Sequence, residues 1–70
     1  MKNILFYAER SLHLPFLEPI EEYLRIGGLA RTAFSAPPFF AGKPGIPQWG
    51  LMPDEIARLE EKAPFIPEPR

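Results

Sequence analysis

The first strongly apolar segment of the chain is an uninterrupted run from Ile4 to Tyr7. A continuous apolar run of this length, without glycine or proline, is typical of a strand that is covered on both faces in a parallel sheet. The polar residues Glu9, Arg10 and Ser11 follow it and mark its end. The pattern therefore predicts a buried strand over residues 3–8.

The next segment has the spacing of an amphipathic helix that ends at Gly27 and Gly28, a pair typical of a helix C-terminus. Pro15 and Pro19 are both suited to its first turn, and if the helix begins at Pro15, we expect Pro19 to bend it. The side chains expected to face the core are Phe16, Ile20, Tyr23 and Leu24. The side chains expected on the opposite, solvated face are Glu18, Glu21, Glu22 and Arg25.

A second, shorter strand is predicted over residues 29–34, reached after a helix long enough for a parallel crossover. We therefore predict an α/β fold with a half-Rossmann-like β-α-β unit over residues 1–36. A long loop rich in proline, glycine and aromatic residues follows over 37–52, then a short helix over 53–63 and an extended tail over 64–70. Because the tail stops where a third strand is expected, we interpret the chain as part of a larger parallel-sheet domain.

The composition limits how such a chain can be stabilised. Ordering 70 residues costs on the order of 100 kcal/mol, at roughly 1.5 kcal/mol per residue, and a small core barely offsets this cost. Without cysteine and with a single histidine, the chain has neither a disulfide framework nor a zinc cluster available. The remaining routes are oligomerisation, an unusually good core, or a further part of the protein.

The net charge of the chain does not favour nucleic acid or an anionic membrane as a partner. A hydrophobic fraction of 46% argues against disorder, and a net charge of −1 gives no electrostatic case for nucleic acid or an anionic membrane. No apolar run approaches the roughly 20 residues that span a bilayer, and the N-terminal run is too short for a signal peptide. We therefore expect a cytoplasmic location. No glycine-rich phosphate cradle is present, and no cofactor is expected.

The candidate chemistry lies between the first strand and the helix. His13 could act as a general base on an acceptor hydroxyl, with Glu9 or Glu18 as its orienting carboxylate, or it could be a capping or surface histidine. Glu9, Arg10 and Ser11 could bind a phosphate or sugar, or form a solvated turn. In the long loop, Phe39, Phe40 and Trp49 are expected to tuck the loop onto the protein rather than to stack on a sugar.

Residues 4–34 resemble the N-terminal unit of nucleotide-sugar glycosyltransferases of the GT-B type and of the related CDP-glycerol glycerophosphotransferases. That pattern is an apolar strand, a loop with a histidine followed by a proline, a helix that ends in arginine-any-glycine, and a second strand. The matching residues are Ile4 to Ala8, His13, Pro15, Arg25-Ile26-Gly27 and Leu29 to Phe34. Leu12 stands where many members have glycine, and the proline is one residue closer to the histidine than is usual.

The resemblance implies the acceptor-side part of a glycosyl- or glycerophosphate-transferase, with His13 as catalytic base and Glu9, Arg10 and Ser11 as substrate-binding residues. It implies a nucleotide-activated donor and a hydroxyl acceptor as partners, and peripheral membrane association through the missing part. The 70-residue chain by itself is expected to be inactive, because such an enzyme needs two domains facing a cleft. The alternative is a small interaction or self-associating module with exposed strand edges and no catalysis.

Overall fold

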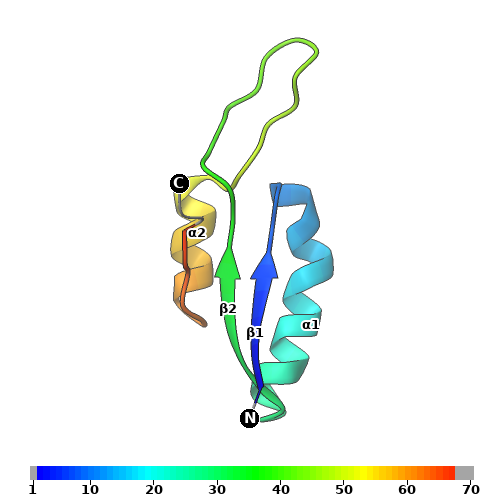
Figure 1. The fold of residues 1–70 in the computed structure, drawn as a ribbon, viewed down its shortest axis with the longest axis vertical. Coiled ribbons are helices and arrows are strands. Elements are labelled where there is room, and N and C mark those ends of the chain that lie inside the picture. The colour runs from blue at the N-terminus through cyan, green and yellow to red at the C-terminus, as the bar shows by residue number, and fades with distance from the viewer. Residues whose placement is uncertain (1, 68–70) are drawn as a thin grey trace.

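A computed structural model describes residues 2–67 and shows a mixed α/β chain (Figure 1). Strand β1 (Lys2–Tyr7) leads through a 3-10 turn (Ser11–His13) into helix α1 (Leu14–Ile26). Strand β2 (Ala30–Ser35) and helix α2 (Pro53–Glu60) follow. The predicted β-α-β unit and short second helix are therefore confirmed, and each strand lies one residue from its predicted bounds. No helix within residues 2–67 has the length and hydropathy needed to cross a bilayer.

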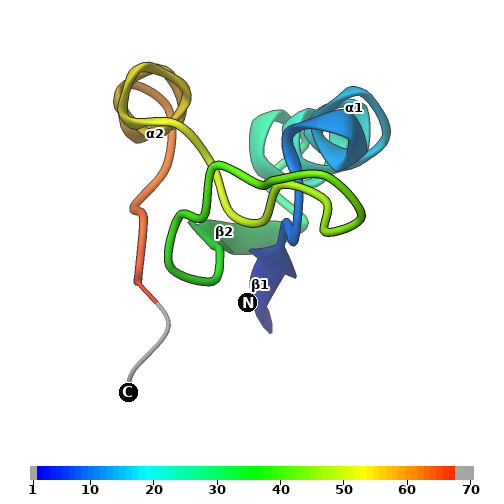
Figure 2. The ribbon, with the colours of Figure 1, turned by 90° about the horizontal axis from the view of Figure 1, so that it is seen from above.

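Strands β1 and β2 are parallel, in a register that runs from Lys2 opposite Ala30 to Tyr7 opposite Ser35. Both helices lie on the same face of this sheet, as Figure 2 shows from above. Between the helices and the sheet lies a core of buried apolar side chains: Phe6, Ala8, Leu14, Phe34, Ala36, Leu51, Leu59 and Ala63. Phe6 and Phe34 come from neighbouring strands, and their rings lie 5.9 Å apart, centroid to centroid.

The other face of the sheet is open, which corrects the prediction that the first strand is covered on both faces. On β1, Leu5 keeps 54% and Tyr7 41% of its surface exposed, whereas Phe6 between them is buried. The apolar run therefore does not mean burial on both sides. No described helix or strand packs on the face of Leu5, because α1, which connects the two strands, and α2, which follows β2, lie on the opposite face.

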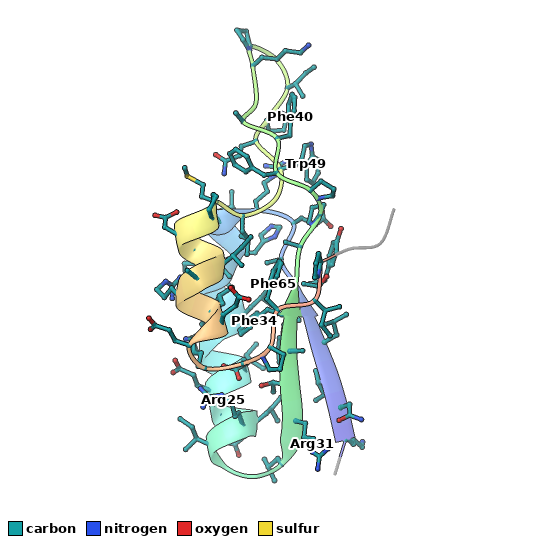
Figure 3. The ribbon with its side chains drawn as sticks, turned by 90° about the vertical axis from the view of Figure 1, so that its left-hand side faces the viewer. Arg25, Arg31, Phe34, Phe40, Trp49 and Phe65 are labelled. Carbon is teal, nitrogen blue, oxygen red and sulfur yellow. The ribbon has the colours of Figure 1, made fainter. Side chains whose placement is uncertain are left out.

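The tail after α2 lies along the outer edge of β2, in the position of a third parallel strand. The Phe34 N–H donates to the Pro64 carbonyl at 2.8 Å, and the Ile66 N–H donates to the Phe34 carbonyl at 2.8 Å. Phe65 thereby lies beside Phe34 (Figure 3). The predicted tail over residues 64–70 thus pairs with β2 at one point, at Phe65, and its residues 68–70 lie outside the described part of the chain. Strand β1 forms the opposite edge of the sheet.

Helix α1 begins at Leu14, with Pro15 in its first turn and Pro19 inside the helix. Of the two starts that the sequence leaves open, at Pro15 or near Pro19, the structure has the earlier one, whereas the predicted core face of the helix is wrong. Leu24 packs against the core, whereas the exposed fractions are 71% for Phe16, 53% for Ile20 and 71% for Tyr23. The side chains that face the sheet are Leu14, Leu17, Glu21 and Leu24.

Three side-chain stripes account for this orientation. At about 100° per residue, the sheet-facing stripe, the stripe of Glu18, Glu22 and Arg25, and the stripe of Phe16, Ile20 and Tyr23 lie about a third of a turn apart. Two of the three stripes are mainly apolar, so hydrophobic periodicity alone cannot select the buried one. The polar contacts of the helix make the choice.

Glu21 is fully buried between α1 and β2. Its Oε2 accepts hydrogen bonds from the Thr32 hydroxyl at 2.5 Å and from Nε of Arg25 at 2.7 Å. Its Oε1 is buried without a hydrogen-bond partner among the described residues. A carboxyl group is costly to bury without hydrogen bonds, and these two bonds offset that cost. They therefore fix the side of α1 that faces the sheet.

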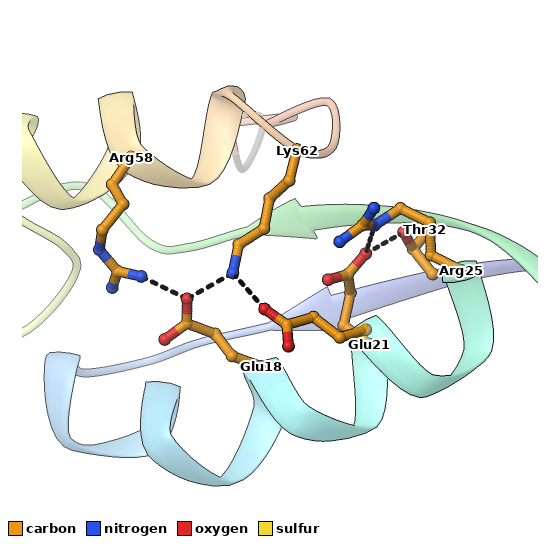
Figure 4. A network of polar contacts seen from close by, with 7 residues as sticks. Glu18, Glu21, Arg25, Thr32, Arg58 and Lys62 are labelled. Atoms are coloured by element: carbon orange, nitrogen blue, oxygen red, sulfur yellow. Dashed lines mark hydrogen bonds and ion pairs between the residues drawn. The ribbon is translucent and has the colours of Figure 1, made fainter. Parts of the chain in front are cut away.

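The acidic stripe of α1 faces α2, where its carboxylates meet two cations (Figure 4). Lys62 Nζ lies 2.9 Å from Oε1 of Glu18 and 3.0 Å from Oε1 of Glu22, and Arg58 also donates to Glu18. Burial acts to raise the pKa of Glu18, but the bonds from Arg58 and Lys62 outweigh it and lower that pKa. Burial acts to lower the pKa of Lys62, but its bonds to Glu18 and Glu22 raise it. These ion pairs hold α1 beside α2.

The buried carboxylate yields a stability prediction. Thr32→Val keeps the shape of the side chain and removes one donor to Glu21, so we expect a loss of about 1–3 kcal/mol of unfolding free energy, measured by urea denaturation. The double variant Glu21→Leu/Thr32→Val removes both polar partners and should recover most of that loss, because Leu continues the apolar stripe of Leu17 and Leu24. A double variant less stable than Thr32→Val would contradict this account.

Candidate functional site at the carboxyl ends of the strands

The loops that follow β1 and β2 lie at the same end of the sheet. In open α/β sheets, ligands bind outside the carboxyl ends of the strands, so this end is the natural place for a site. The loop after β1 carries Glu9, Arg10, Ser11 and His13. The loop after β2 rises well beyond the sheet as a long excursion before it returns to α2 (Figure 1).

This excursion is a narrow hairpin rather than an irregular loop. Phe40 and Trp49 exchange backbone hydrogen bonds at 2.9 and 3.0 Å, and Lys43 and Ile46 close the turn at its tip with bonds of 2.9 and 2.8 Å. Of the three aromatic residues predicted to tuck the loop onto the protein, Trp49 makes such a contact. Phe39 and Phe40 keep 47% and 39% of their surface exposed, and Figure 3 shows Phe40 on the hairpin.

Gly50 attaches the hairpin to the end of β1. Its N–H donates to the Glu9 carbonyl at 2.7 Å, and its backbone has φ +78°, a conformation that favours glycine. A Cβ at this position would lie 2.7 Å from the Pro37 carbonyl oxygen and 2.9 Å from Cα of Phe39. Only glycine therefore lets the two arms of the hairpin approach this closely.

This attachment brings Trp49 against Arg10. The guanidinium carbon of Arg10 lies 4.8 Å from the centroid of the Trp49 ring, a cation–π contact. Among the described residues, no carboxylate forms an ion pair with Arg10. The stacked guanidinium is therefore held in place while its N–H donors stay available to an anion.

Arg10 and Ser11 line a pocket of about 360 Å³ together with Leu12, Pro47 and Gln48. The structure thus joins two of the predicted substrate-binding residues to hairpin residues that the sequence pattern did not single out. A guanidinium, a hydroxyl and an amide are groups that bind phosphate or sugar oxygens. Within residues 2–67, no group of three or more possible metal-binding side chains gathers.

Glu55 is an acid of this site that was not predicted from the sequence. Its Oε1 accepts from the Ser11 hydroxyl at 2.7 Å and from the Met52 N–H at 3.0 Å. Met52 directly precedes α2, and Glu55 lies three residues after it. At this spacing a side chain caps the N-terminus of a helix by accepting from the backbone N–H. The spacing at the start of α2 was the available signal, but the contact with Ser11, 44 residues away, depends on the tertiary fold.

His13 closes the 3-10 turn and directly precedes α1, at the junction predicted from the sequence. Its side chain is half-buried and makes no capping hydrogen bond. Of the two expected orienting carboxylates, Glu18 is paired with Arg58 and Lys62, and Glu9 is exposed with no described bond to the imidazole. Among residues 2–67, neither Glu9 nor Glu18 is therefore bonded to His13 as the orienting carboxylate of a general base.

The role of Gly50 can be measured with Trp49, the one tryptophan of the chain. We expect Gly50→Ala to cost about 2 kcal/mol or more and to shift Trp49 fluorescence to the red, because a Cβ forces the hairpin away from Arg10. Gly45→Ala is the matched control, since Gly45 has φ +84° but no atom within 4 Å of the place that the added Cβ would occupy. Equal fluorescence shifts in both variants would contradict the role of close packing at Gly50.

The sequence matches no family model, no curated protein and no solved structure.

Proposed function

We propose that this chain is a protein-interaction module that binds its partner through the outer face of α1, without catalysis. The observation that carries this proposal is the exposure of one continuous apolar stripe. The exposed fractions are 71% for Phe16, 53% for Ile20, 71% for Tyr23 and 75% for Ile26. Phe16, Ile20 and Tyr23 lie along the side of α1 that faces neither the sheet nor α2. Ile26 extends this surface from Tyr23 at the end of the helix, beside Glu22.

The size of this stripe supports a binding role. Taking about 200 Å² for each full side chain, the four exposed fractions amount to roughly 500 Å² of apolar surface. The largest apolar patches of monomeric proteins measure about 300–600 Å² and are often functional. Scattered exposed hydrophobic residues need no explanation, but four of them in one helical stripe favour a partner.

Site-specific photo-crosslinking tests this proposal. We expect p-benzoylphenylalanine in place of Tyr23 to form covalent adducts with protein in cells that express the chain. The same amino acid in place of Phe39, an exposed aromatic residue of the hairpin, is the control and should form few. Absence of protein adducts at position 23, or equal adducts at both positions, would contradict the proposal.

The pocket at the carboxyl end of β1 favours a second candidate function, the acceptor-side part of a glycosyl- or glycerophosphate-transferase. Arg10 would bind the phosphates of a nucleotide-activated donor beside Ser11, whose hydroxyl donates to Glu55. His13 would take the proton of the acceptor hydroxyl as its oxygen attacks the sugar carbon or the glycerol-bearing phosphorus, and the nucleotide would leave as its bond to that atom breaks. The free guanidinium of Arg10 supports the binding step. The engagement of Glu18 with α2 leaves the base without its expected orienting partner, so we rank this function second.

A titration of the labelled chain with UDP or CDP, followed by NMR, tests the second candidate. We expect amide shifts at Arg10, Ser11 and Gln48, and their loss in Arg10→Gln, because the phosphate contact depends on the guanidinium. Arg31→Gln is the control, since Arg31 is exposed on β2 and lies outside this pocket. Shifts that persist in Arg10→Gln, or no shifts with either nucleotide, would exclude this function for the pocket.

A further inference from the structure

We infer that the partner of the α1 stripe is a second copy of this chain, packed with its α1 antiparallel to the first about a two-fold axis at Ile20. The inference rests on the proposed function. Ile20 is the central residue of α1, which spans Leu14–Ile26. Phe16 lies four residues before it and Tyr23 three residues after it, the spacing of helices that pack side by side.

An antiparallel pair makes this stripe self-complementary. The two Ile20 side chains meet at the axis, and each Phe16 lies opposite Tyr23 of the second copy. Each contact then joins two apolar side chains, as a two-fold symmetric interface requires of a single surface. The antiparallel direction also opposes the two helix dipoles.

Charge favours a second copy over a charged partner. The stripe carries no charged residue, and the acids of the neighbouring stripe are engaged within their own chain. Glu18 and Glu22 are paired with Lys62, and Glu21 on the sheet-facing stripe is bonded to Arg25 and Thr32. Two copies therefore approach through this face without bringing unpaired like charges together. A partner with a charged surface would find no complement on the stripe.

The area of the stripe is also in the range of a dimer interface. Roughly 500 Å² from four side chains is a large share of the roughly 800 Å² that each partner buries in a standard interface. Polar residues beside the stripe would supply the rest of the buried area.

Sedimentation equilibrium over a concentration series tests the inference with the purified chain. We expect a monomer–dimer equilibrium that Ile20→Glu weakens by about 100-fold or more, because two carboxylates then meet at the axis. Ile46→Glu at the hairpin tip is the control and should leave the equilibrium unchanged, since Ile46 is similarly exposed at 44%. Circular dichroism establishes that both variants retain native helix content.

Engineered cysteines test the geometry, because the chain has no cysteine of its own. On oxidation, Ile20→Cys should form a covalent dimer faster than Ile46→Cys. A mixture of Phe16→Cys and Tyr23→Cys should form the mixed dimer in preference to either homodimer. A parallel pair would instead join Phe16→Cys to itself, and that result would overturn the antiparallel arrangement.

The outcomes separate this inference from the proposed function. A chain that stays monomeric throughout the series overturns the inference, and so does an Ile20→Glu variant that dimerises like the parent chain. If the crosslinker at position 23 then captures a different protein in a single defined adduct, the interaction function stands with another partner. If position 23 captures nothing and the chain is monomeric, both fail.

Discussion

The hydrogen bond between the buried Glu21 carboxylate and the Thr32 hydroxyl determines how α1 lies on the sheet. Glu21 is fully buried and Thr32 nearly so, and the bond joins the middle of the helix to the middle of β2. Without these partners the carboxyl group would be buried with no donor, at a cost in free energy, so the two bonds favour the side of α1 that also carries Leu14, Leu17 and Leu24.

Once Glu21 faces the sheet, the remaining acids of α1 face α2. Arg58 and Lys62 then pair with them and link the two helices along one face of the sheet. The same rotation turns Phe16, Ile20 and Tyr23 outward. The chain thus uses its polar residues to join its own elements and leaves a continuous apolar stripe for contact outside. This distribution is the reverse of an ordinary amphipathic surface helix, and it is why we propose an interaction function ahead of catalysis.

The end of the sheet presents a different kind of surface. There the hairpin returns through Gly50 to the end of β1, and this places Trp49 on Arg10 and Pro47 and Gln48 beside Ser11. The pocket combines a held guanidinium with polar neighbours, so it suits a small anionic ligand. It lies on the loops, whereas the apolar stripe lies along α1, and the two surfaces can therefore be tested by separate substitutions.

Local pattern in the sequence determined the elements and their order. The apolar run of β1, the glycine pair after α1 and Pro53 at the start of α2 act within a few residues, so the two strands, both helices and the loop end that carries Arg10, Ser11 and His13 could be predicted. Only the tertiary structure decided which face of α1 is buried and that β1 is covered on one side. It also decided that Glu18 pairs with Arg58 of α2 and that Glu55 accepts a hydrogen bond from Ser11. Two of the three faces of α1 are mainly apolar, and the deciding bond to Thr32 joins residues 11 positions apart on different elements. Periodicity along one helix carries no information about such a partner.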